Sequence, residues 1–159
     1  VSSTKKNIGA TSPESVFGVS KSELKVLADY VTSDVNTLPS PLPQMAMVYI
    51  DLGGTGTATF DASHQFRGGG LVFVDGNLTI NSDSNGYFSG VVYCTGKVTI
   101  NGPAMISGIV VAITGLEISG VSDVAEVDYD EGIINTVRQQ LAFYRENKSA
   151  YFTFTAFKE

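Results

Sequence analysis

The chain contains few of the residues that build disulfides, thiolate metal sites or catalytic dyads. Among its 159 residues there is one cysteine, Cys94, one histidine, His64, and no tryptophan. A single cysteine excludes an intrachain disulfide and a zinc site made of cysteines. Because no second histidine is present to act as its base, we predict that Cys94 is a small hydrophobic core residue.

The single histidine lies in the segment Asp61-Ala62-Ser63-His64, which holds the three residue types of a serine hydrolase triad. A triad needs a fold that brings these groups together around an oxyanion hole, and adjacency in sequence does not supply this. We therefore predict no catalytic role for His64.

Charge is also scarce, and positive charge most of all. Only 16% of the residues are charged, the net charge is −6 and the isoelectric point is near 4.7. Such a surface repels nucleic-acid phosphates and anionic lipids, so we expect no nucleic-acid partner. No apolar run reaches the roughly 20 residues that span a bilayer, so we expect membrane attachment only through an apolar helix preceding Val1.

What the chain does contain is an internal repeat. The segments Gly70–Asn81 and Gly90–Asn101 align residue by residue, and Ile109–Ser119 is a looser third copy. The repeats share a turn glycine, which recurs at nearly equal intervals as Gly76, Gly96 and Gly115. A period of about 20 residues means that each copy is one supersecondary unit stacked on its neighbours.

Alternation within the repeats assigns the side chains to two faces, because successive residues of a strand point to opposite sides. We predict a short right-handed parallel β-helix with three short strands in each coil, the third of them at Ala104–Ile106. Phe73 and Tyr93 are predicted to stack on the outer face. The residues predicted to point inward are Val72, Val74, Leu78, Ile80, Val92, Cys94, Val98, Ile100, Val110, Ala112, Leu116 and Ile118.

The ends of a solenoid expose unpaired backbone and an open core, so they need covering segments. Residues 1–45 contain a polar start, a capping box at Ser20–Glu23, an amphipathic helix through Val31 and a proline-rich connector at 38–43. The β-helix is predicted for 46–130. Residues 131–159 are predicted to form a C-terminal capping helix and an aromatic tail, Tyr151–Phe157, packed along the solenoid.

The repeat pattern, followed by Val127-Asp128-Tyr129-Asp130 and an amphipathic helix, resembles the extracellular part of PilX-type pilus assembly proteins. These are pilin-like proteins of type IV pilus systems with a β-helical body, and the resemblance covers roughly residues 45–145. It implies a non-catalytic structural or adhesion subunit at the cell surface, with protein partners in a pilus. Bactofilins, which are cytoskeletal β-helix polymers, are similar in repeat style.

Some parallel β-helices are polysaccharide lyases or hydrolases, and their chemistry needs two or three carboxylates on one face. Asp75 is single in its ladder, and Lys97 and Glu117 form a neighbouring pair near Asn77. We interpret these as a turn carboxylate and a surface ion pair, and we predict no enzyme activity, cofactor or metal.

The acidic run 123–131 contains a fragment of a calcium loop, Asp128-x-Asp130, without the full ligand order, so helix capping is the preferred interpretation. The main functional expectation is contact through an outward strip of Phe73 and Tyr93. The alternatives are a carbohydrate-binding or polysaccharide-cleaving β-helix and, third, a bactofilin-like polymer.

Overall fold

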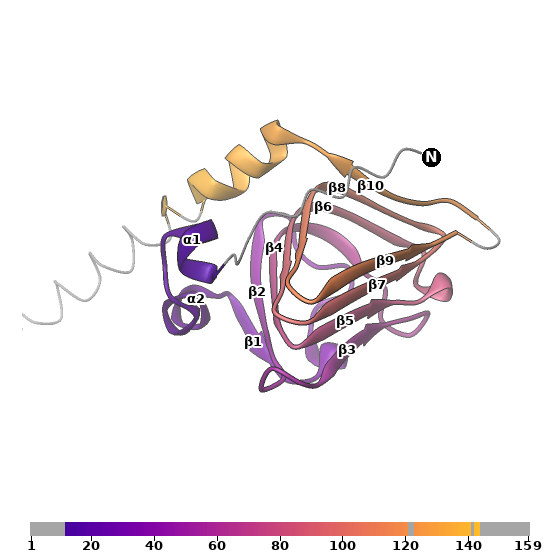
Figure 1. Cartoon of the computed structure of the whole chain (residues 1–159), viewed down its shortest axis with the longest axis horizontal. Coiled ribbons are helices and arrows are strands. Elements are labelled where there is room, and N and C mark those ends of the chain that lie inside the picture. Colours follow the sequence, from indigo (N-terminus) through magenta and orange to yellow (C-terminus); the bar gives the residue numbers. More distant parts are fainter. Residues whose placement is uncertain (1–11, 121–122, 141, 144–159) are drawn as a thin grey trace, which may run out of the picture.

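The computed structural model describes residues 12–120, 123–140 and 142–143 and is a parallel β-solenoid of about 5 turns (Figure 1). Its strands form two sheets, and all paired strands are parallel. The larger sheet holds, in spatial order, β1 (Tyr30–Thr32), β2 (Ala46–Asp51), β4 (Arg67–Asp75), β6 (Gly86–Cys94), β8 (Ala104–Ala112) and β10 (Ala125–Tyr129). The smaller sheet holds β3 (Thr57–Phe60), β5 (Asn77–Ile80), β7 (Lys97–Asn101) and β9 (Gly115–Ser119). The predicted β-helix class is confirmed.

The register places the predicted inward residues in ladders that run from coil to coil. Neighbouring strands lie about 4.8 Å apart, so each apolar side chain packs on its equivalents above and below. The two ladders of the smaller sheet are Ala58–Leu78–Val98–Leu116 and Phe60–Ile80–Ile100–Ile118. Those of the larger sheet include Val48–Val72–Val92–Val110 and Ile50–Val74–Cys94–Ala112.

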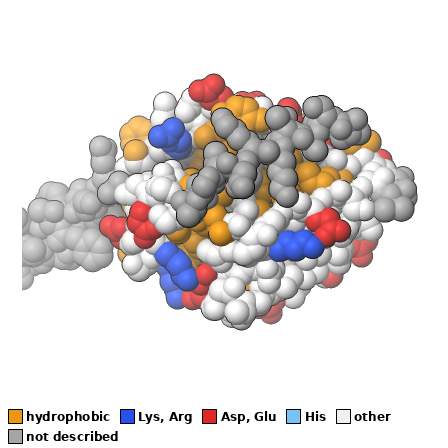
Figure 2. Space-filling view, in the orientation of Figure 1, with side chains coloured by type: hydrophobic (Ala, Val, Ile, Leu, Met, Phe, Trp, Pro, Cys, Tyr) orange, Lys and Arg blue, Asp and Glu red, His pale blue; other side chains and the backbone are white. Residues whose placement is uncertain are grey.

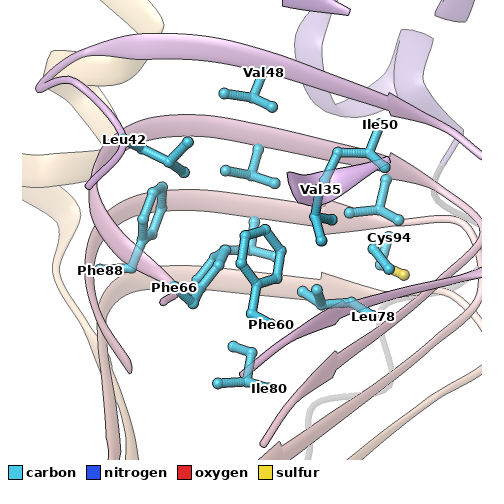
Figure 3. Packing of buried hydrophobic residues seen from close by; sticks show 14 of the residues in the cluster. Val35, Leu42, Val48, Ile50, Phe60, Phe66, Leu78, Ile80, Phe88 and Cys94 are labelled. Carbon is cyan, nitrogen blue, oxygen red and sulfur yellow. The ribbon is translucent and has the colours of Figure 1, made fainter. Parts of the chain in front are cut away.

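The interior of the solenoid is filled by these side chains (Figure 3). Three phenylalanine rings occupy one corner of it: Phe66 lies between Phe60 and Phe88, with both pairs of ring centroids 4.8 Å apart. All three rings are at most 1% exposed. The interior is thus a packed core and contains no channel along the described coils.

Each coil has two strands, and the predicted third strand is wrong. Ala104 and Ile106 do align with Gly86 and Phe88, but they belong to the long strands β8 and β6. These strands bend at stacked glycines instead of breaking. At Gly108 the backbone has a φ of 129°, and a Cβ there would lie 2.0 Å from the carbonyl oxygen of Gly90. Only glycine permits this close approach, so the bend takes the place of a turn.

Two short helices, α1 (Pro13–Phe17) and α2 (Lys21–Leu27), pack on the outer face of the larger sheet. The predicted capping box is present: Glu23 accepts a hydrogen bond from the Ser20 backbone N–H at 2.7 Å, and Ser20 Oγ accepts one from the Glu23 N–H. The helix ends at Leu27, so its predicted continuation through Val31 is wrong. Residues 30–32 instead form β1, because this segment pairs with the otherwise free edge of β2.

The proline-rich connector closes one end of the solenoid rather than merely linking helix and body. The 3-10 helix η1 (Val35–Thr37) and the residues after it place apolar side chains over the first coil. Leu38 is 5% exposed and Leu42 is 2% exposed, and both belong to the core cluster. The first coil therefore has a hydrophobic lid made from the chain itself.

Residues 131–140 form the predicted C-terminal helix, but this helix does not cap the last coil. It runs across the outer face of the larger sheet, from β10 toward α1 (Figure 1). Val137 is 6% exposed and packs in the same cluster as Met47 and Leu71. Leu141, Tyr144 and the predicted tail 151–157 lie outside the described residues, as does the polar start at 1–11.

Candidate interaction surfaces

The aromatic strip predicted as an interaction surface is stacked as expected but is not exposed. The Phe73 and Tyr93 rings are parallel to within 7°, with centroids 5.0 Å apart, and Tyr49 continues the stack 4.9 Å from Phe73. Phe73 and Tyr93 are each only 1% exposed, because α1, α2 and the helix 131–140 cover them. Phe17 of α1 meets the Tyr93 ring edge-on at 5.4 Å. The strip is an internal interface between the solenoid and its own helices.

Asp75 lies under the same helices and is not a free turn carboxylate. It is 3% exposed, and the Lys21 ammonium lies 2.5 Å from its Oδ2. Asp51 occupies the equivalent position one coil earlier, and Lys25 lies 2.5 Å from that carboxylate. The hydrogen bond from Lys25 lowers the pKa of Asp51. Two lysines one helical turn apart thus neutralise two stacked carboxylates and fasten α2 to the sheet.

The pairing of Asp51 with Asp75 was missed at the level of sequence, although a signal for it exists. Val48-Tyr49-Ile50-Asp51 has the same pattern as Val72-Phe73-Val74-Asp75, at a longer interval than the one between the later copies. The extra length is taken up in the coil between β2 and β4. A β-helix glycosidase needs a pair of carboxylates, and these two are the candidates for such a pair in the described residues. Each of them is bound by a lysine of the overlying helix α2.

The predicted ion pair between Lys97 and Glu117 is confirmed, at 2.5 Å and on the surface. Its hydrogen bond lowers the pKa of Glu117. Asn77 is the third neighbour, as predicted: its Oδ1 accepts a hydrogen bond from the Lys97 backbone N–H at 2.9 Å. Asn77 and Lys97 begin β5 and β7, whereas Glu117 lies in the middle of β9, in register with Thr99. The ion pair is too exposed to contribute much stability.

His64 and Asp61 do not form a dyad. Asp61 Oδ1 accepts hydrogen bonds from the Ser63 hydroxyl at 2.5 Å and from the backbone N–H of Ser63, and these bonds lower the pKa of Asp61. The imidazole is 7% exposed and faces the Phe60 ring, and its Nε2 has no hydrogen-bond partner. The serine hydroxyl therefore stabilises the turn through Asp61, and His64 Nε2 makes no hydrogen bond with it.

Cys94 is a core side chain, as predicted. It is 0% exposed, and its thiol donates to the Gly76 carbonyl oxygen at 2.7 Å. Burial raises the pKa of the thiol to about 11, so it remains neutral and unreactive at ordinary pH.

The acidic run supplies a helix cap and no ligand cluster within the described residues. Asp130 Oδ1 accepts a hydrogen bond from the Ile133 N–H at 3.0 Å, which is the N-terminal capping expected of an acidic residue here. No three His, Cys, Asp or Glu side chains in the described part of the chain are grouped so that they could hold a metal ion.

The last coil of the solenoid leaves apolar side chains uncovered. In β9, Leu116 is 38% exposed and Ile118 is 44% exposed, whereas Val98 and Ile100 directly beneath them are 0% exposed. Beyond β9 and β10 no further strand is present among the described residues. We call the edge of β9, with Leu116 and Ile118, the open end. Figure 2 shows hydrophobic side chains on one face of the molecule, with acidic and basic side chains around them.

A shallow groove of about 610 Å³ lies where the connector crosses the start of β4. Its lining includes Arg67 and Tyr87, which occupy equivalent positions in adjacent strands. Tyr87 is 57% exposed, and Arg67 Nε donates to the Asn85 carbonyl oxygen at 3.0 Å. The rest of the lining is Pro41, Leu42, Pro43, Gln44 and Gly68, without a carboxylate. The groove offers one ring and one cation for contact, and no acid–base pair.

Comparisons with protein-family models, with curated proteins and with solved structures find no match to this chain. None of the helices in the described residues is long and apolar enough to cross a membrane. What the chain does must therefore be argued from its own surfaces.

Proposed function

We propose that this protein is a non-catalytic structural or adhesion subunit of a cell-surface assembly of the type IV pilus class. Its resemblance to PilX-type proteins in the repeat and in the Val127-Asp128-Tyr129-Asp130 ending motivates the choice of assembly. In this proposal the domain lies outside the cell, and an apolar helix preceding Val1 in the full-length protein would anchor it.

The side chains of the described residues support contact rather than turnover. The stacked carboxylates Asp51 and Asp75 are each bound by a lysine, and the Cys94 thiol is buried. A hydrolase or lyase needs an acid and a base that a substrate can reach, and the groove at Tyr87 has no carboxylate in its lining.

The observation that carries the proposal is the open end. A solenoid normally covers its last coil, because an exposed edge strand above an apolar core is a template for another strand. Here one end is covered by Leu38 and Leu42, while Leu116 and Ile118 remain exposed at the other. A protein partner that supplies a strand with apolar side chains would complete the last coil.

The proposal is tested in cells that produce the full-length protein. Ile118→Asp should place a charge in the contact and reduce the number of surface filaments or the attachment of cells, since burying an unpaired carboxylate is costly. Glu117→Gln on the same strand is the matched control and should change neither. Unchanged filaments and attachment after deletion of the whole gene would overturn the proposal.

A second candidate function, carbohydrate binding without cleavage, is favoured by the groove. An exposed tyrosine ring beside an arginine provides a stacking face and hydrogen-bond donors for a sugar. Tyr87→Ala should then abolish glycan binding by the purified protein and leave its thermal unfolding unchanged. Depolymerisation of a polysaccharide that is abolished by Asp75→Asn would instead contradict both candidates.

The third alternative, a bactofilin-like polymer of directly stacked solenoids, is disfavoured by the closed end. Coils of two copies could continue into each other only if both ends exposed strand edges and core residues, and the connector covers the first coil.

A further inference from the structure

The open end lacks a further strand, and the chain contains a segment with the sequence pattern that such a strand would need. In the smaller sheet, the strand motif apolar–Thr–apolar occurs as Leu78-Thr79-Ile80 and Val98-Thr99-Ile100. The same motif recurs in the tail as Phe152-Thr153-Phe154, inside the alternating segment 151–157. Its apolar residues alternate with polar ones, as the exposed pair Leu116 and Ile118 does. A strand with this pattern would continue both ladders of the smaller sheet by one rung.

We propose that residues 151–157 of one copy add as a strand to β9 of a second copy and close its open end. The proposal rests on the function proposed above, and it names the partner as another copy of the chain. Because the donated tail and the receiving edge are different surfaces, the contact is heterologous and links copies head to tail into an open chain.

Charge favours the same pairing. The stretch 117–131 around the open end contains no Lys or Arg. Besides Glu117, which is paired with Lys97, its acidic residues are Asp123, Glu126, Asp128, Asp130 and Glu131. The tail segment has Lys148 three residues before it and Lys158 directly after it, followed by Glu159. The two lysines can meet the acidic margin, whereas two open ends facing each other would bring like charges together.

The position of the C-terminal helix favours a second copy over closure within one chain. The helix runs away from β10, and Val137 and Gln140 lie beside Met47 and Leu71 of β2 and β4 (Figure 1). From β2 to β10 there are four strand spacings, about 19 Å. The link 144–150 reaches about 23 Å when fully extended.

Closure within one chain would also require the link to cross from the larger to the smaller sheet, about 10 Å further. The link would then have to be almost straight. The β9 strand of a second copy is not held at this distance from the end of the helix, so donation to a second copy is free of this constraint.

The test uses the purified whole chain and two variants, one for each surface. Phe152→Asp/Phe154→Asp alters the tail, and Ile118→Asp alters the open end, where 44% exposure allows a charge without loss of the fold. Thr153→Lys is the matched control, because in the proposed strand its side chain would point away from the apolar face. Circular dichroism and thermal unfolding confirm that each variant is folded; Leu116→Asp replaces Ile118→Asp if the latter is not.

Sedimentation velocity over a concentration series gives the outcome. The unaltered chain and Thr153→Lys should form a ladder of oligomers that weakens with added salt, and each Asp variant alone should associate at least about tenfold more weakly. A mixture of the tail variant with the open-end variant should give a 1:1 dimer and nothing larger. In this mixture the intact tails belong to the open-end variant and the intact open ends belong to the tail variant. One copy of each can therefore pair, and neither surface left over can bind a third copy, as only head-to-tail donation predicts.

Three results would overturn the inference: a chain that is monomeric at all concentrations, association that survives the tail variant, or no dimer in the mixture. The first, together with hydrogen-exchange protection of residues 151–157, would show that the tail closes its own solenoid. The proposed function fails separately, since it is decided by filaments and attachment in cells. A monomeric chain whose Ile118→Asp variant still loses filaments would refute only the copy-to-copy contact.

Discussion

The Lys21 ammonium lies 2.5 Å from the Asp75 carboxylate, and the lysine of this pair is exposed whereas the aspartate is buried. The lysine side chain is 49% exposed, whereas the aspartate side chain is 4% exposed. The pair therefore differs from Lys97 and Glu117, which are also 2.5 Å apart but are both more than half exposed. Its position beneath α2 makes it a fastener between the helices and the solenoid.

This difference predicts unequal effects for two lysine substitutions. Lys21→Met should lower the free energy of unfolding by about 1–3 kcal/mol, because it leaves a buried carboxylate without its charged partner. Lys97→Met should lower it by less than about 0.5 kcal/mol, because water screens the exposed pair. Urea unfolding at neutral pH measures both, and equal effects would mean that α2 does not hold Asp75 out of water.

Position in the ladder predicts a second contrast. Ile100→Ala should cost about 2–5 kcal/mol of stability, through lost burial and the cavity left in a filled core. Ile118→Ala, the same substitution one coil further along, should cost less than about 1 kcal/mol, because 44% of that side chain is already in water. Chemical denaturation of the two variants checks this. A large loss for Ile118→Ala would show that something covers the open end of the isolated chain.

Most of the solenoid could be predicted from the sequence. The repeats alternate apolar and polar residues, and only one register stacks the apolar residues of one coil on those of the next. The ladders through Leu78 and Ile80 were predicted with the correct register. What the sequence could not show is what lies over the outer face. Phe73 points outward, as alternation predicts, but its exposure depends on helices that are distant from it along the chain. Local patterns carry no information about such long-range covering, and for the same reason the C-terminal helix was expected on the wrong surface.

The stacked glycines predict a position where the smallest possible side chain is not tolerated. A Cβ on Gly90 would lie 2.0 Å from the Gly70 carbonyl oxygen, so Gly90→Ala must displace the backbone of two coils. We expect a loss of about 3 kcal/mol or more, with a lower thermal midpoint. Gly53→Ala is the control: it also has a positive φ, but no atom lies within 4 Å of the added carbon, so about 1 kcal/mol of backbone strain is expected. Similar losses of stability for Gly90→Ala and Gly53→Ala would mean that the backbones do not approach each other closely at Gly90, and would contradict the bend assigned there.

The buried thiol gives a prediction with a defined pH range. Burial raises the pKa of Cys94 from 9.0 to about 11, so the folded protein holds the thiol proton more tightly than the unfolded chain. The stabilisation is therefore full below pH 9 and is lost as the pH rises through about 11, by up to about 3 kcal/mol. At pH 8 a thiol reagent should label the native protein only as fast as it unfolds, and urea should accelerate the reaction. Cys94→Ala/Ile118→Cys, with its thiol at the open end, should react at once; rapid labelling of Cys94 itself would contradict the assigned core position.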